Sequence, residues 1–245
     1  ILSHMTREQL QRIYPDTYAF FKDVDDGHPF WTAIDRVDWN DARDGKTILP
    51  QLEQVFASLL PVDRDNVLKD QLEDLATHEE LMDILTRLYV AYLYRKHGTR
   101  MVNEKHGYDL EIEMADQLLA MGIVKLQNFK SLRRQFAMQA MTDQDGKPEE
   151  STEEFLNHLK EHAKTLGEHP NADQQVLAAI TEHSKLDHET ALAARVQQSP
   201  QEMEESFPHI AGVVLIDPES GREKVRYVPF HGHEGELEQL LERLG

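Results

Sequence analysis

The feature that most constrains the fold is a change in hydrophobic periodicity at Gly98. Before it, apolar residues from Leu81 to Tyr92 recur every three to four positions, which predicts one face of an amphipathic helix. Thr77 and Glu80 have the spacing of a capping box, so we expect this helix to begin at Thr77. After Gly98, residues 108–114 alternate between apolar and acidic side chains, which predicts a half-buried strand. The order of the two patterns favours an α+β protein.

The second half of the chain contains further strand and helix patterns. Residues 118–126 are almost all apolar and predict a central strand, antiparallel to 108–114 and adjacent to it, with Asp109 and Lys125 on the same side of the sheet. Two more predicted strands, 210–216 and 224–230, flank a turn rich in Pro, Ser and Gly. We expect helices at 128–141, 151–167, 171–197 and 234–244.

The N-terminal region is expected to be a separate part, because it contains short helical patterns and much of the aromatic content of the chain. We therefore expect three parts: a cloning scar at 1–5, a helical N-terminal segment at 6–76, and an α/β domain at 77–245. With 245 residues, of which 40% are hydrophobic, the chain can bury a substantial core.

Composition excludes several classes of function. The absence of Cys rules out disulfides, thiolate metal sites and a Cys nucleophile. No apolar run approaches the roughly 20 residues of a membrane helix, and no targeting segment is recognisable, so we expect a cytoplasmic protein that does not contact membranes. There is also no cofactor-binding motif, and the leading hypothesis needs no cofactor.

The charge distribution bears on possible partners. The formal net charge is -19, which repels a polyanion at long range. Residues 117–142 contain no acid, and Lys130, Arg133 and Arg134 lie close together there. These three residues are the expected nucleic-acid contacts, but a protein partner is favoured over tight nucleic-acid binding.

From about residue 80 to 245, the order helix, strand, strand–turn–strand, helix, later strand resembles the restriction-endonuclease-like, or PD-(D/E)XK, superfamily. Asp109 on one strand and Lys125 on the next match its motif. The resemblance implies a mixed sheet flanked by helices, with acids that hold Mg²⁺ and a Lys that positions or activates water. Under this resemblance, the catalytic residues would be Asp109, Glu111 and Lys125. The metal ligands would be Asp109, Glu111 and Glu80, with Asp83 as another candidate for the helix acid.

The sequence departs from this motif at one important place. The acid expected two positions before Lys125 is Ile123, whose side chain cannot bind metal. The leading hypothesis is therefore a non-catalytic binding or scaffold module on a degraded nuclease-like fold, in a bacterial DNA-related or defence system. The alternative is an active Mg²⁺-dependent nuclease in which Glu111, on the same strand face as Asp109, replaces the missing ligand.

A second alternative is a zinc hydrolase. His158, Glu161 and His162 form the pattern H-x-x-E-H, in which two histidines share a helix face and the Glu could act as general base. The predicted helix should bury a different stripe, so that the histidines flank a polar surface, and we expect no tightly held zinc. The stripe consists of Phe155, Leu159, Ala163 and Leu166.

Overall fold

A computed structural model describes residues 4–58, 69–102, 107–124, 151–181, 187–217, 224–230 and 235–243. These residues form two compact units that divide between Arg95 and Lys96. The sequence led us to expect a division at 76/77. The helix that follows this point groups with the first unit instead, because it packs against two of that unit's helices.

The described part of the first unit is helical. Its helices are α1 (Arg7–Ile13), α2 (Pro15–Phe21), α3 (Pro29–Ile34), α4 (Trp39–Arg43), α5 (Leu49–Ser58), α7 (Lys69–Glu73) and α8 (His78–Leu93). Helix α8 packs against α3 and α5. Stacked aromatic rings fill part of the core, with the rings of Phe21 and Phe30 3.6 Å apart between centroids. Burial of such large apolar surfaces holds short helices together that would not form alone.

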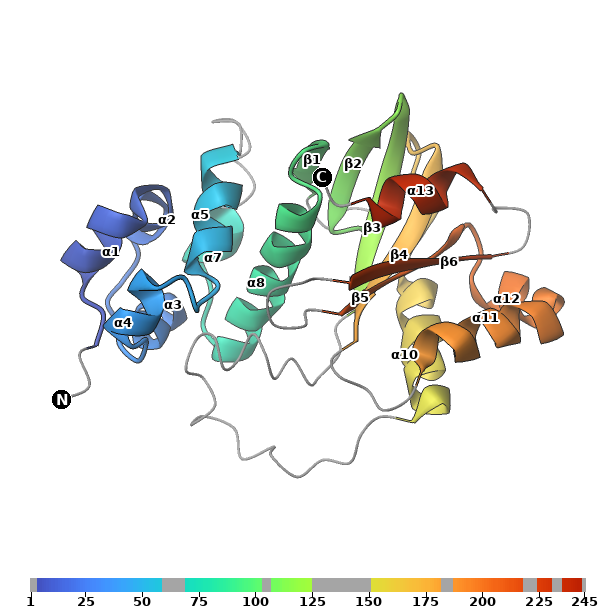
Figure 1. The fold of residues 1–245 in the computed structure, drawn as a ribbon, viewed down its shortest axis with the longest axis horizontal. Coiled ribbons are helices and arrows are strands. Elements are labelled where there is room, and N and C mark those ends of the chain that lie inside the picture. Colours follow the sequence, from blue (N-terminus) through green and yellow to red (C-terminus); the bar gives the residue numbers. More distant parts are fainter. Residues whose placement is uncertain are drawn as a thin grey trace. The chain divides into compact units, whose positions relative to one another are not determined.

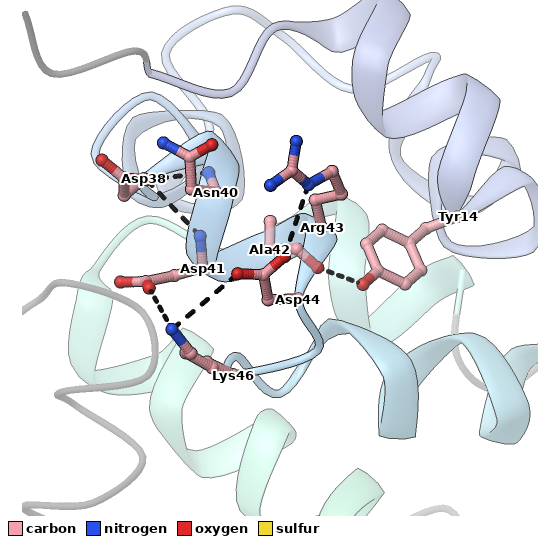
Figure 2. A network of polar contacts seen from close by, with 8 residues as sticks. All are labelled: Tyr14, Asp38, Asn40, Asp41, Ala42, Arg43, Asp44 and Lys46. Carbon is pink, nitrogen blue, oxygen red and sulfur yellow. Dashed lines mark hydrogen bonds and ion pairs between the residues drawn. The ribbon is translucent and has the colours of Figure 1, made fainter.

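Polar contacts fix the ends of these short helices, and Figure 2 shows one group around α4. The carboxylate of Asp38 accepts hydrogen bonds from the backbone N–H groups of Asn40 and Asp41, which caps the helix. The phenol of Tyr14 donates to the carbonyl of Ala42 over 2.6 Å (Figure 2). The second contact ties α4 to the junction of α1 and α2, so it sets the position of α4 within the unit.

A six-stranded mixed sheet forms the centre of the second unit (Figure 1). Its strands lie side by side in sequence order; only β3, β4 and β5 pair in parallel, while the other neighbours are antiparallel. The strands are β1 (Gly98–Met101), β2 (Leu110–Met114), β3 (Gln117–Val124), β4 (Gln174–Ile180), β5 (Gly212–Asp217) and β6 (Lys224–Pro229).

The predicted pairing of 108–114 with 118–126 is confirmed for the described residues, because β2 and β3 are adjacent and antiparallel with Leu110 opposite Met121. Ala115 and Asp116 connect them and both have positive φ, 46° and 66°. Positive φ at both positions of a two-residue loop is the geometry that follows the natural twist of a hairpin. Lys125 lies outside the described residues, so its side of the sheet stays a prediction.

In the part of the second unit that the structure describes, the helices beside the sheet are α10 (Thr152–Thr165), α11 (His188–Gln198), α12 (Pro200–Ser206) and α13 (Glu236–Glu242). Helices α10, α11 and α12 share a hydrophobic core with one face of the sheet. Helix α13 packs along the edge strand β6, where the carboxylate of Glu242 accepts from the backbone N–H of Tyr227 over 3.0 Å. This contact satisfies an N–H group that an edge strand would otherwise leave open.

One predicted helix is wrong. Residues 171–197 do not form a single helix, since strand β4 occupies 174–180 and α11 begins at His188. A parallel strand in the middle of a sheet is buried on both faces and therefore shows no alternation. Residues 176–180 are all buried, and their Leu and Ala side chains also suit a helix, so periodicity alone cannot distinguish the two. The predicted helix 128–141 lies outside the described residues.

Candidate functional site

The candidate site lies on the face of the sheet that packs against α10, and the strand register places its residues. Glu111 on β2 lies opposite Ala120 on β3, and Ala120 lies beside Gln175 on β4. Residues directly opposite one another in neighbouring strands point to the same face. The small side chain of Ala120 thus lies between the carboxylate of Glu111 and the side-chain amide of Gln175. It leaves room above Ala120 for a residue from another element.

His169, in the loop between α10 and β4, bridges the carboxylate and the amide. Its ring Nε2 is 3.0 Å from a carboxylate oxygen of Glu111, and its backbone N–H donates to the side-chain oxygen of Gln175. Its Nδ1 accepts from the backbone N–H groups of Asn171 and Ala172, at 3.3 and 3.1 Å. Because Nδ1 accepts, the ring proton lies on Nε2 and is donated to Glu111.

Tyr108 lies in the segment before β2 and contacts His169 and the loop that carries it. Its hydroxyl donates to the carbonyl of Gly167 over 2.8 Å, and its ring meets that of His169 edge to face, with centroids 5.7 Å apart. Burial raises the pKa of Tyr108 to about 12, so the phenol is neutral in the physiological range. We call Tyr108, Glu111, His169 and Gln175 the His169 cluster.

Asp109, the strand acid of the nuclease-like motif, forms a hydrogen bond within the sheet. Its side chain is buried, with 8% of the residue exposed, and one carboxylate oxygen accepts from the backbone N–H of Ile123 over 2.7 Å. The backbone N–H of Asp109 donates to the carbonyl of Met121. The carboxylate of Asp109 therefore takes the place of a backbone carbonyl as hydrogen-bond acceptor at the end of the β2–β3 pair. Ile123 is itself buried, with 2% exposed.

Glu80, the candidate helix acid, caps α8 in the first unit. Its carboxylate accepts from the backbone N–H groups of Ala76 and Thr77, and Thr77 accepts in return from the N–H of Glu80. The two backbone hydrogen bonds lower the pKa of this carboxyl group. The capping box predicted from the sequence is confirmed. Asp83 lies on the same helix and is half-buried.

In the described part of the chain, the strand carboxylates of the expected metal site take part in hydrogen bonds within the protein. One oxygen of Asp109 accepts from the backbone N–H of Ile123, and one oxygen of Glu111 accepts from the ring of His169. Within the described ranges, no group of three or more His, Asp or Glu side chains could hold a metal ion. Lys125 and the expected nucleic-acid contacts Lys130, Arg133 and Arg134 lie outside those ranges.

The three residues of the H-x-x-E-H pattern have different surroundings. His158 is exposed, and Glu161 pairs with Lys164 over 2.6 Å. His162 is half-buried, and its Nε2 lies 3.4 Å from where a Cβ on Gly122 of β3 would be. The predicted apolar stripe of α10 is buried, but His162 faces the sheet and not a polar surface as expected. The reason is Gly122, whose missing side chain leaves space for the imidazole.

Sequence reasoning missed His169, Tyr108 and Gln175 as members of one cluster. His169 is followed by Pro170 and Asn171, which is a turn signal, but a turn does not reveal its tertiary partners. Glu111 and His169 are 58 positions apart in the chain. Only the register of β2, β3 and β4 brings them together.

Comparison with protein-family models, with curated proteins and with solved structures found no match. In the residues that the structure describes, no helix is both long and apolar enough to cross a membrane. The fold defines the class: an α+β protein with a six-stranded mixed sheet flanked by helices.

Proposed function

We propose that this protein is a non-catalytic binding or scaffold module built on a degraded restriction-endonuclease-like fold, in a bacterial DNA-related or defence system. The proposal depends chiefly on one observation: the carboxylate of Asp109 accepts a hydrogen bond from the backbone of Ile123, the residue that stands where the motif has its second acid. A carboxylate that accepts a backbone hydrogen bond in this way stabilises the sheet. It is poorly placed to hold Mg²⁺ as well.

The succession of elements supports the nuclease-like ancestry. Helix α8 is followed by β1, the β2–β3 hairpin, α10 and then β4, which is the order on which the resemblance rests. Strands β3 and β4 pair in parallel, and a parallel pair needs a crossover connection, which here includes α10.

A protein partner is favoured over nucleic acid, since a net charge of -19 opposes a polyanion. Any binding of duplex DNA should be weak, salt-sensitive and dependent on Lys130, Arg133 and Arg134. Fluorescence anisotropy with labelled duplex DNA at low and physiological salt measures this.

The deciding experiment is a cleavage assay on duplex DNA with Mg²⁺ or Mn²⁺. The wild type, Asp109→Asn and Lys125→Ala are compared, with Glu113→Ala as a matched control, because Glu113 is an exposed acid on the same strand. Asp109→Asn keeps an oxygen for the N–H of Ile123 but loses the charge that a metal needs. We expect no metal-dependent cleavage by any of the four proteins.

The alternative, an active Mg²⁺-dependent nuclease with Glu111 as the replacement ligand, makes the opposite prediction. Wild type and Glu113→Ala would cleave, while Asp109→Asn and Lys125→Ala would not. That pattern would replace the scaffold proposal with the nuclease.

A further inference from the structure

We propose that the Asp26–Gly27 bond, in the first unit, is a modification site at which the aspartate converts spontaneously to isoaspartate through a cyclic succinimide. Water is the co-reactant, and the inference does not depend on the proposed function. The same dipeptide occurs at 44–45, and the structure favours reaction at the first of these two. A further copy at 145–146 lies outside the described residues.

The reaction uses only the two residues themselves. The nitrogen of Gly27, which no side chain of its own hinders, attacks Cγ of Asp26 in its acid form. A C–N bond forms, and the carboxyl hydroxyl leaves as water with the amide proton. Water then breaks the bond between this nitrogen and the former main-chain carbonyl carbon. The product has the original mass, but its main chain runs through Cβ and Cγ of the aspartate.

The Asp26–Gly27 peptide group is the central one of a turn between α2 and α3. The backbone N–H of His28 donates to the carbonyl of Asp25 over 2.9 Å, which closes a β-turn with Asp26 and Gly27 in its middle positions. The central peptide group of such a turn can flip between the type I and type II orientations while the closing hydrogen bond stays in place. A glycine in the third position permits both orientations. The turn therefore allows the rotation that ring closure needs.

The two reacting groups are also accessible. Asp26 pairs with Arg7 over 2.7 Å, but its side chain is 89% exposed, and an ion pair in water holds a side chain weakly. Among the described residues, the N–H of Gly27 has no hydrogen-bond acceptor, and the space where a Cβ on Gly27 would lie is open. No strong contact thus holds the carboxyl group and the nitrogen apart.

The dipeptide at 44–45 ends α4 in a conformation that opposes the reaction. Asp44 has ψ 4°, so the Gly45 nitrogen lies on the side of the aspartate's own nitrogen and away from its side chain. The N–H of Gly45 donates to the carbonyl of Ala42 over 3.2 Å. The Asp44 carboxylate pairs with Arg43 and Lys46 (Figure 2). Rotation of this peptide group breaks the backbone hydrogen bond, so ring closure at Asp44 has a higher barrier.

Isoaspartate at position 26 acts on the turn that positions His28. It adds one carbon to the main chain directly before Gly27. One ring nitrogen of His28 accepts from the N–H of Phe30 over 3.1 Å at the start of α3, and the other lies 2.6 Å from the carbonyl of Leu72 on α7. A longer turn shifts the residue that joins α3 to α7, so the modification loosens the first unit.

The test is to store the full chain at physiological pH and temperature and to follow both sites by peptide mapping with mass spectrometry. Isoaspartyl and aspartyl peptides separate by chromatography, and in water labelled with heavy oxygen each passage through the ring adds one label. We expect isoaspartate to form at least about fivefold faster at Asp26 than at Asp44, which corresponds to one hydrogen bond in the barrier. In guanidinium chloride the two rates should become similar, because the dipeptides are identical.

Two glycine variants make the test specific. In Gly27→Ala the added methyl group meets no atom within 4 Å, so the variant should fold, but it hinders attack by its own nitrogen. Isoaspartate at position 26 should therefore form several-fold more slowly. Gly167→Ala is the matched control, since a Cβ there also has open space, and it should react at Asp26 as the wild type does.

The proposal is overturned if Asp44 reacts as fast as Asp26 in the folded protein, or if Asp26 takes up no label before unfolding. It is equally overturned if Gly27→Ala forms isoaspartate at the wild-type rate, since the reaction would then not pass through attack by this nitrogen.

Discussion

At the scale of single residues, a carboxylate can act as a substitute for a backbone carbonyl. Asp109 accepts the N–H of Ile123 inside a sheet from which water is largely excluded. A buried N–H group that loses its acceptor bears the cost of desolvation without compensation. The side chain of Asp109 therefore matters for stability whether or not it has any chemical role.

We expect Asp109→Ala to lower the free energy of unfolding by roughly 1–3 kcal/mol, because the N–H of Ile123 stays buried without an acceptor. Asp109→Asn should recover most of this loss, since its amide oxygen can accept the same hydrogen bond. Urea denaturation followed by circular dichroism measures both, with Glu113→Ala as the exposed control. Equal stability of Asp109→Ala and wild type would show that the hydrogen bond contributes nothing.

Two buried tyrosines differ in whether their hydroxyl groups have a hydrogen-bond partner. The hydroxyl of Tyr108 donates to Gly167, whereas the hydroxyl of Tyr227 lies over Gly212 without a hydrogen-bond partner among the described residues. Burial raises the pKa of Tyr227, and the nearby carboxylate of Glu238 raises it further.

We therefore expect Tyr108→Phe to lose about 1 kcal/mol of stability, and Tyr227→Phe to be neutral or stabilising, because it removes a buried polar group that is not paired. Thermal unfolding of the two variants beside the wild type measures the difference. A loss in Tyr227→Phe as large as that in Tyr108→Phe would indicate that Tyr227 has a partner.

At the scale of elements, the β2–β3 hairpin keeps its register although Ala115 is poorly suited to its loop. Ala115 and Asp116 both adopt positive φ, a conformation that Gly, Asn and Asp tolerate but that the side chain of Ala disfavours. The strands compensate, because Leu110, Ile112, Leu119 and Met121 are buried and a slip by one residue would turn them away from the core.

The double substitution Ala115→Asn with Asp116→Gly should stabilise the protein by about 1 kcal/mol, since Asn-Gly is the preferred pair in this turn. Ala115→Val, which places a β-branched residue at positive φ, should destabilise it. Chemical denaturation of both variants gives the sign of each effect. Opposite signs to these would mean that the loop is not in the left-handed conformation.

At the scale of the whole molecule, local patterns determined much of the fold but little of the site. The capping box at Thr77, the apolar stripe of α10 and the hairpin between 108–114 and 118–124 follow from contacts between residues that are near in sequence. Such contacts leave periodic or capping signals that can be read directly.

Only the tertiary structure decided the rest. Strand β4 carries an apolar run that suits a helix as well as a strand, and its place between two parallel neighbours makes it a strand. His169 meets Glu111 because Ala120 and Gln175 stand in register across β3 and β4. These pairings depend on which distant segments lie side by side, and no local pattern encodes that.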